Sequence, residues 1–285
     1  MTGLLLAAAL VFSPSDARLA RDTAQRLVDG HTPRDSGTIA SAQAATALLD
    51  AASATGADVF VDRFVAETPM GARRFTNLEG RYAPDPAADW VVLVSHYDTK
   101  TGVDCPGAND GASTSGLLVA ISEALFRQRP KGVNVLFVWT DGEECMHAYS
   151  ETDGFWGSKR AARRLRESGR KVRAVIVLDM LGDRDLGIVV PRNGTSELRE
   201  LALRVARENG MDGLVAPSED LVKDDHVAFL REGFKAIDLI DFEYGSGPGK
   251  NDYWHTAADT MDKVSEHSLL VSGTLALGMI EALGK

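Results

Sequence analysis

Four short runs of apolar residues constrain the fold of this 285-residue chain more than any other feature of its sequence. Apolar runs of about four to eight residues are typical of strands that are buried on both faces of a sheet, whereas helices need longer segments. The runs are WVVLVSH (90–96), VNVLFVWT (133–140), RAVIVLDM (173–180) and AIDLID (236–241). They predict the central strands of a sheet.

Segments with the apolar spacing of helices lie between and after these runs, at residues 113–129, 157–167, 196–209, 225–232 and 265–283. Strands that alternate with helices form mostly parallel sheets, because the helices carry the chain back across the sheet. We therefore predict an α/β fold in three layers, with a mostly parallel mixed sheet between two layers of helices.

The N-terminal part of the chain adds further elements to this sheet. Residues 17–28 and 41–54 have helical spacing, and residues 58–65 and 74–82 alternate like the two strands of a hairpin. A chain of this length, with 44% hydrophobic residues, can bury one large core. We predict a single α/β domain over residues 18–285.

The first 17 residues have features of a weak export signal. Residues 4–12 (LLLAAALVF) resemble the apolar core of a secretory signal, and Ser15-Asp16-Ala17 places small residues at a plausible cleavage spacing. No Lys or Arg precedes this stretch, and the alternative is a buried N-terminal segment. We predict a leader over residues 1–17 and export to the periplasm or the medium.

The net charge and the number of cysteines exclude some classes of partner and a disulfide-rich fold. The net charge of −10 argues against nucleic acid or an anionic membrane surface as the main partner. No apolar run approaches the length of a membrane span. Cys105 and Cys145 are too few for a disulfide framework, although in an exported protein they could pair with each other.

Histidines and carboxylates follow the predicted strands. In parallel sheets, ligands bind beyond the carboxyl ends of the strands, so these residues should meet at one edge. Each residue alone has an ordinary explanation as a turn, a helix cap or a solvated loop. Together they require a cation, because buried like charges repel and are costly to desolvate. The residues are His96, Asp98, Asn109, Asp110, Glu143, Glu144, Asp179 and His255.

The types and spacing of these residues suit zinc. Two histidines and several carboxylates form a nitrogen and oxygen ligand set that zinc accepts. His96 can direct one ring nitrogen at a metal while Asp98 accepts a hydrogen bond from the other nitrogen. Of the adjacent Glu143 and Glu144, one can bind metal while the other stays free as a general base.

Seven motifs in this order resemble one known enzyme family. They are SHYDTK, GANDGAST, DGEE, GSKRAARRL, VLDMLGD, DDHVAFLREG and YWHT, and they run from about residue 90 to residue 265. The chain resembles the zinc aminopeptidases of the bacterial leucyl aminopeptidase type and their relatives, the glutaminyl-peptide cyclotransferases (glutaminyl cyclases). The resemblance implies the zinc aminopeptidase fold and a substrate that is the N-terminus of a peptide or protein.

The resemblance also assigns roles to individual residues. Asp110, Glu144 and His255 match the metal site that both branches share. His96 and Asp179 match ligands that complete a second zinc in the aminopeptidases, whereas the cyclases normally hold one zinc. The remaining glutamate, Glu143, matches the general acid/base of both branches.

Other positions favour the cyclase branch. The segment between the Glu-Glu pair and Gly157 is long, as in the cyclases, and Asp224 stands where aminopeptidases commonly have Ser. Asp224 matches a residue that shares a proton network with the equivalents of Glu143 and Asp179, so these three are the predicted catalytic carboxylates. Trp254 resembles a cyclase pocket aromatic.

Two more aromatic residues complete the predicted substrate pocket. Tyr149 and Phe155 lie in the long segment and are expected to line the pocket with Trp254. Tyr149 departs from the family, because the animal enzymes have a Trp at its position.

The sequence therefore predicts a glutaminyl cyclase that uses one zinc ion and converts N-terminal glutamine to pyroglutamate with release of ammonia. The first alternative is a two-zinc aminopeptidase, in which Glu143 would activate a water molecule. The second is a non-catalytic binding domain on the same fold, which would require lost ligands, and none is lost.

Overall fold

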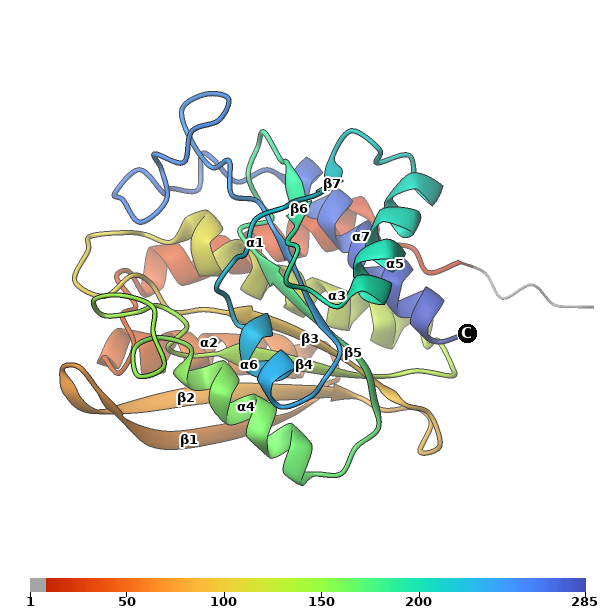
Figure 1. The fold of residues 1–285 in the computed structure, drawn as a ribbon, viewed down its shortest axis with the longest axis horizontal. Helices are drawn as coiled ribbons and strands as arrows, with labels where there is room; N and C mark the ends of the chain where they lie inside the picture. Colours follow the sequence, from red (N-terminus) through yellow and green to blue (C-terminus); the bar gives the residue numbers. More distant parts are fainter. Residues whose placement is uncertain (1–8) are drawn as a thin grey trace, which may run out of the picture.

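The structure is a computed structural model that describes residues 9–285. An eight-stranded sheet runs through the molecule in the order β1-β2-β4-β3-β5-β8-β6-β7 (Figure 1). The strands are β1 (Asp58–Thr68), β2 (Gly71–Tyr82), β3 (Trp90–His96), β4 (Asn134–Thr140), β5 (Val172–Asp179), β6 (Ile188–Val190), β7 (Val215–Pro217) and β8 (Ala236–Ile240). Strands β4, β3, β5 and β8 are parallel, whereas β2 pairs antiparallel with β4 and β6 pairs antiparallel with β8. The predicted mixed, mostly parallel sheet is confirmed.

Helices cover both faces of the sheet (Figure 1). The helices are α1 (Pro14–Gly30), α2 (Ile39–Ala54), α3 (Thr114–Gln128), α4 (Trp156–Glu167), α5 (Ser196–Glu208), α6 (His226–Arg231) and α7 (Glu266–Leu283), and a short π-helical segment, η1 (Ala108–Ser113), precedes α3. Apolar side chains of α1, α2, α3, α5 and α7 form the larger core cluster on one face. Those of α4 and α6 form a smaller cluster on the other face.

Strand β3 shows why the central runs are continuously apolar. Val91 and Leu93 point into the larger cluster, and Val92 and Val94 point into the smaller one. Successive side chains of a strand face opposite sides of the sheet, and here both sides are covered by helices. The run therefore has no solvent face that would select polar residues.

The N-terminal residues that the structure describes are part of this core. Helix α1 begins at Pro14, and Phe12 and Ala17 are buried in the larger cluster. Asp16 is also buried and pairs with Arg127 of α3, with 2.7 Å between Oδ1 and Nη1. Cleavage after Ala17 would therefore remove the first turn of α1. Residues 1–8, which contain much of the predicted leader, lie outside the described residues.

Two strands and one helical segment were not predicted. Strands β6 and β7 have three residues each, which is too short to show an alternating pattern. Segment η1 contains the predicted ligand Asp110, and its backbone leaves the helical conformation at Asp110 and Gly111.

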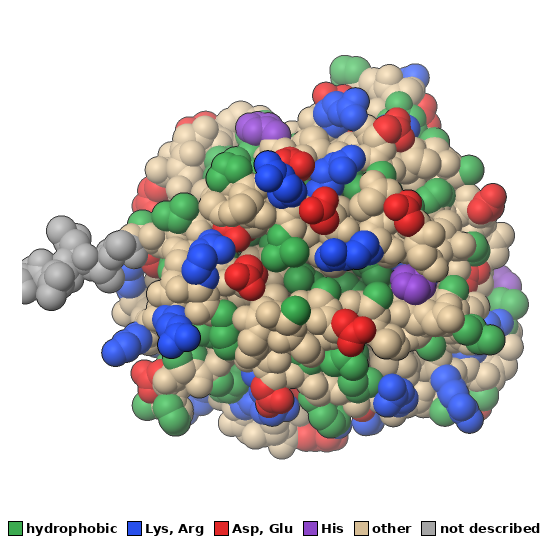
Figure 2. All heavy atoms as spheres, turned by 180° about the vertical axis from the view of Figure 1, so that it is seen from behind, with side chains coloured by type: hydrophobic (Ala, Val, Ile, Leu, Met, Phe, Trp, Pro, Cys, Tyr) green, Lys and Arg blue, Asp and Glu red, His purple; other side chains and the backbone are tan. Residues whose placement is uncertain are grey.

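The surface carries charges of both signs. Figure 2 shows, on the side opposite to that of Figure 1, basic side chains interspersed with acidic ones. Among the described residues, no helix has the length and apolar character needed to cross a membrane.

Candidate metal centre

The predicted ligands meet at the carboxyl edge of the central strands. His96 ends β3 and Asp179 ends β5, while Glu144 lies in the loop after β4. Asp110 comes from η1, and His255 comes from the loop between β8 and α7. Their ligand atoms form two groups, Asp110–Glu144–His255 and His96–Asp110–Asp179, and within each group the atoms lie within 4.8 Å of one another.

Asp110 connects the two groups. Its Oδ2 lies 3.3 Å from Nε2 of His255, and its Oδ1 lies 3.1 Å from Nε2 of His96. The same nitrogen of His255 is 2.7 Å from Oε1 of Glu144, and that of His96 is 3.2 Å from Oδ1 of Asp179. Each histidine nitrogen is thus directed at two carboxylates, an arrangement that converges on a cation position in both groups.

In both groups the neighbouring acids and histidines shift each other's pKa values. Burial lowers the pKa of His96, but hydrogen bonds with Asp110 and Asp179 more than offset burial, so the pKa is raised well above its usual value. His255 shows the same balance, and its pKa is raised to about 9. Burial raises the pKa of Asp110, but the two histidines outweigh burial, so its pKa is lowered. The carboxylates therefore favour positive charge at this position.

Asp98 supports the pair of glutamates. Its Oδ1 accepts a hydrogen bond from the backbone N–H of Glu143 (3.2 Å), and its Oδ2 accepts one from Glu144 (3.1 Å) and one from Ser36 (2.9 Å). Its Oδ1 lies 3.6 Å from Nδ1 of His96, which is longer than a hydrogen bond. Asp98 thus binds the backbone of Glu143 and Glu144, whereas the predicted hydrogen bond to His96 is not formed.

The loop that carries Asp110 is held by a residue that the sequence analysis missed. Asp259 accepts hydrogen bonds from the backbone N–H groups of Asn109 (2.8 Å) and Asp110 (3.2 Å) and from the hydroxyl of Tyr244 (2.6 Å). Gly111 follows at φ 93°, and a β-carbon there would come 3.0 Å from the ring of His96. Asp259 lies four residues after His255, so the YWHT motif was the nearest available signal.

Glu143 stays outside both ligand groups but lies beside them. The hydroxyl of Tyr149 is 3.2 Å from Oε2 of Glu143 and 2.9 Å from Oε2 of Glu144. Burial, followed by the charge of Glu144, raises the pKa of Glu143 well above its usual value. Glu143 therefore holds a proton more readily than an ordinary glutamate does.

A cavity of about 400 Å³ opens onto these residues. It brings together Asp110, Glu143, Glu144, Asp179 and Asp224 with the aromatic side chains of Tyr149 and Trp254. Leu221 and Phe242, which the sequence analysis did not select, also line it, and Leu221 is 65% exposed.

The remaining predicted pocket residue lies elsewhere. Phe155 is buried and stacks on Tyr149 with 4.9 Å between ring centroids, and it does not line this cavity. Phe155 thus supports the pocket wall from behind. It could not be distinguished from Tyr149 in the sequence, because both are aromatic residues of the same loop.

Both cysteines are buried free thiols in the structure. The Sγ and the backbone oxygen of Cys145 accept hydrogen bonds from Nζ of Lys100, at 2.8 and 2.7 Å. The same Nζ lies 3.6 Å from Oε2 of Glu144. The predicted disulfide is absent from this arrangement, and Cys145 instead helps to hold Lys100 beside Glu144.

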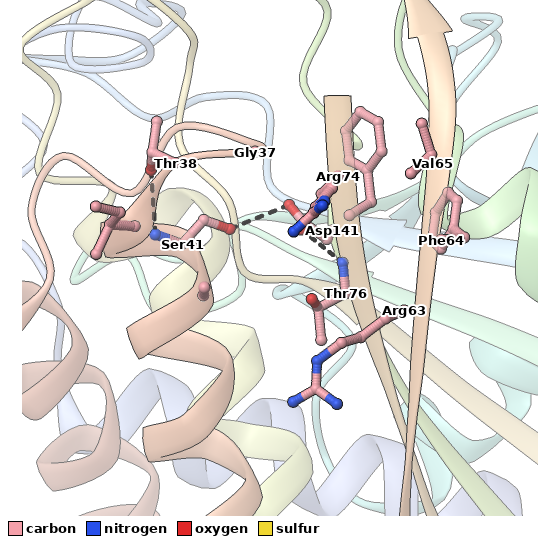
Figure 3. A pocket seen from close by; sticks show the side chains of 12 residues that line it. Gly37, Thr38, Ser41, Arg63, Phe64, Val65, Arg74, Thr76 and Asp141 are labelled. Atoms are coloured by element: carbon pink, nitrogen blue, oxygen red, sulfur yellow. Dashed lines mark hydrogen bonds between the residues drawn. The ribbon is translucent and has the colours of Figure 1, made fainter. Parts of the chain in front are cut away.

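A second cavity, of about 500 Å³, lies between the start of α2 and the β1–β2 hairpin (Figure 3). The acid that lines it is Asp141, whose oxygens accept hydrogen bonds from the hydroxyl of Ser41 (3.2 Å) and the backbone N–H of Thr76 (2.8 Å). The candidate metal groups in the described part of the chain include none of its lining residues. The smaller cavity is therefore the candidate active site.

Comparisons with known proteins place the chain in a family. The model of peptidase family M28 matches residues 77–280. A glutaminyl-peptide cyclotransferase-like protein of Bos taurus is 27% identical over 262 residues, which cover 80% of this chain and 66% of the bovine protein. The chain thus spans about two thirds of the length of that relative.

Solved structures match over the full length. The crystal structure of an Acidobacteriales bacterium glutaminyl cyclase superposes with a TM-score of 0.90 and 31% identity, covering 100% of this chain and 99% of that one. A glutaminyl cyclase of Porphyromonas gingivalis superposes with a TM-score of 0.84 and 26% identity, covering 95% and 98%.

Proposed function

The chain belongs to peptidase family M28 and is a homologue of its glutaminyl cyclases, and we propose that it converts the N-terminal glutamine of peptides or proteins to pyroglutamate with release of ammonia. One observation carries this proposal: a group of metal ligands and a separate buried glutamate open onto the same aromatic-lined cavity. In cyclisation the nucleophile is the substrate's own amine. The enzyme must therefore supply a pocket that folds the glutamine and a group that carries the proton.

We propose one zinc ion at Asp110, Glu144 and His255. The residues fit this ion because one imidazole and two carboxylates supply three ligands and leave a position open for substrate. Zinc bound there would polarise the side-chain amide carbonyl of the glutamine.

Glu143 would move the proton. It would take a proton from the α-amine as the amine attacks, and it would give the proton to the leaving nitrogen. The raised pKa of Glu143, caused by burial and by Glu144, suits this exchange, because a carboxyl group with an ordinary pKa would rarely carry a proton at neutral pH. The Tyr149 hydroxyl can donate its one proton to Glu143 or to Glu144, and it would help to fix the orientation of Glu143.

Asp179 and Asp224 would support the proton transfer. Burial raises their pKa values to about 6 and about 7. Carboxyl groups in that range can share protons with Glu143 instead of presenting full negative charges to it. Their position on the wall of the cavity is consistent with this role.

The aromatic wall would fold the substrate. Tyr149 and Trp254 line the cavity together with Leu221 and Phe242, so the glutamine side chain would lie between apolar surfaces. Such surfaces would bring the amine to the amide carbonyl and reduce competition from water.

A two-zinc aminopeptidase is the second candidate, and the position of His96 favours it. Nε2 of His96 lies within 3.2 Å of both Asp110 and Asp179, so a second ligand group is assembled and His96 is not turned away. In that case Glu143 would take a proton from an attacking water molecule. Asp224 and the aromatic wall of the cavity argue for the cyclase instead.

The test offers the zinc-loaded protein three peptides that differ only in an N-terminal Gln, Leu or Ala. We expect ammonia and a pyroglutamyl peptide from the first and intact chains from the others. Free amino acids without pyroglutamate would establish the aminopeptidase.

We also propose export, on the basis of the apolar residues 4–12 and the small residues before position 18. N-terminal sequencing of protein from fractionated cells tests this. A start at residue 1 in the cytoplasmic fraction would contradict it.

A further inference from the structure

A third cluster of ionisable residues lies beside the candidate active site and has no assigned role. One atom each from Asp224, His226 and Asp238 lies within 4.8 Å of the other two. All three residues are buried, and Asp238 is completely inaccessible in the middle of β8. Asp224 also lines the candidate active-site cavity, so the cluster connects the cavity to the interior.

The carboxylates of this cluster lack ordinary partners. Oδ2 of Asp224 and both carboxylate oxygens of Asp238 have no hydrogen-bond donor within residues 9–285. Oδ1 of Asp224 is satisfied by the backbone N–H of Asp225. Buried acceptors are almost always satisfied, so these orphaned oxygens require an explanation.

The tautomer of His226 argues against a metal ion in this cluster. The side-chain amide of Asn193 is fixed by Val222, whose carbonyl accepts from Nδ2 (2.7 Å) and whose N–H donates to Oδ1 (3.2 Å). Nδ2 therefore also donates to Nε2 of His226, at 2.9 Å. The neutral imidazole must then carry its proton on Nδ1, where no lone pair is left to bind metal.

The charges of the neighbouring groups do not compensate two anions. Asp179 from β5 and Asp225 at the start of α6 add negative charge, and among the largest influences on Asp224 the basic group is His96, from β3. His226 faces the cluster but is neutral, because burial lowers its pKa to about 4. Two carboxylates in contact without a cation cannot both be ionised at low cost.

We propose that Asp238 is a positioning residue, which keeps a proton and donates it to Oδ2 of Asp224, so that Asp224 is held as a single acceptor at the wall of the cavity. One shared proton removes one of the two charges and gives the orphaned oxygens a partner. Burial, with the charge of Asp224 next, raises the pKa of Asp238 well above its usual value, in agreement with a retained proton.

The side of the sheet on which Asp238 lies supports this assignment. Ala236 packs in the smaller core cluster and Ile237 in the larger one, so Asp238 faces the same side as Ala236, where α6 lies. The carboxyl group thus points toward the start of α6, where Asp224 and His226 are located.

The shared proton can be tested without any enzymatic activity. The infrared spectrum of the full chain should contain the carbonyl stretch of a protonated carboxyl group that is lost in Asp238→Asn. Asp241→Asn is the matched control, because buried Asp241 follows the same strand but accepts from the backbone N–H groups of Gly187 and Glu243. Identical spectra for the wild-type protein and Asp238→Asn at neutral pH would overturn the proposal.

Activity gives a second test, which rests on the proposed function. Asp238→Asn can still donate to Asp224, so cyclisation should be kept. The alkaline limb of the pH–rate profile should move up by about one pH unit, because the amide donor cannot ionise. Asp238→Leu fills a similar volume without a donor and should lower kcat by about tenfold or more, with KM and bound zinc unchanged. Equal kcat in the Asn and Leu variants would contradict the proposal. A wild-type protein that forms no pyroglutamate would instead refute the proposed function, while the infrared result would stand by itself.

Discussion

The carboxylates at the carboxyl edge of the sheet fall into two groups that compensate their charge in different ways. Asp110 and Glu144 lie 3.3 and 2.7 Å from Nε2 of His255, and the group is suited to a cation. Within residues 9–285, Oδ2 of Asp224 and both oxygens of Asp238 have no hydrogen-bond donor, and we assign the pair a shared proton. The comparison shows that a buried acid cluster is not sufficient evidence for a metal, because the nearby histidine must also offer a lone pair.

The largest expected effect is on the group that we assign to zinc. His255→Ala removes one of three ligands, so zinc affinity should fall by more than about 100-fold. Removing a residue that only hydrogen-bonds to a ligand lowers metal affinity by up to about 100-fold, and loss of the ligand itself should cost more. Competition with a chelator measures this affinity. His226→Ala is the matched control, and an equal loss of zinc in that variant would show that the two groups do not differ as we describe.

The next effect separates zinc binding from proton transfer. Glu143→Gln keeps the shape of the side chain but cannot carry the proton, so kcat should fall on the order of 10²-fold or more while zinc is retained. Glu151→Gln is the control, because Glu151 belongs to the same loop but is exposed and pairs with Arg231. Near-normal turnover in the Glu143 variant would remove Glu143 from the mechanism.

An intermediate effect is expected from the residue that supports the glutamates. Asp98→Ala removes the acceptor of the backbone N–H groups of Glu143 and Glu144, so zinc affinity should fall by about 10-fold or more while the fold persists. Zinc titration at fixed pH measures this. Unchanged affinity would show that the loop holds its conformation without Asp98.

These residues also show how far the sequence alone could reach. Glu144 follows an apolar run and Asp179 lies at the end of one, so their meeting at one edge follows from the parallel sheet. Asp238 lies inside such a run, whereas Asp224 is 14 residues earlier in the chain, before α6. Only the packing of α6 on β8 brings these two residues together. Asp259 could not be assigned because two of its three partners are backbone N–H groups, which no sequence pattern displays.

The proton-sharing group should make stability depend on pH in the absence of zinc. Burial raises the pKa of Asp224 from 3.8 to about 7, so the folded state binds protons more tightly than the unfolded state. The free energy of unfolding should therefore fall as pH rises from about 4 to about 7. Urea unfolding across this range should show a smaller fall for Asp238→Asn than for the wild-type protein, and parallel curves would contradict the assignment.

The smallest effect is expected in the cavity of Figure 3. Ser41→Ala removes one donor to Asp141, which keeps the backbone N–H of Thr76, so the free energy of unfolding should fall by about 1 kcal/mol. Cyclisation should be unaffected, because this cavity lacks the metal ligands. A large loss of kcat without a loss of stability would assign this cavity a catalytic role.

The most direct test of the account is the position of bound zinc in crystals grown with excess metal. Anomalous scattering at the zinc edge should give one strong peak in contact with Asp110, Glu144 and His255, and no peak between Asp224 and Asp238. A second peak of equal height between His96 and Asp179 would contradict the one-zinc cyclase and favour the aminopeptidase. A peak beside Asp238 would contradict the distinction between cation and proton on which the account depends.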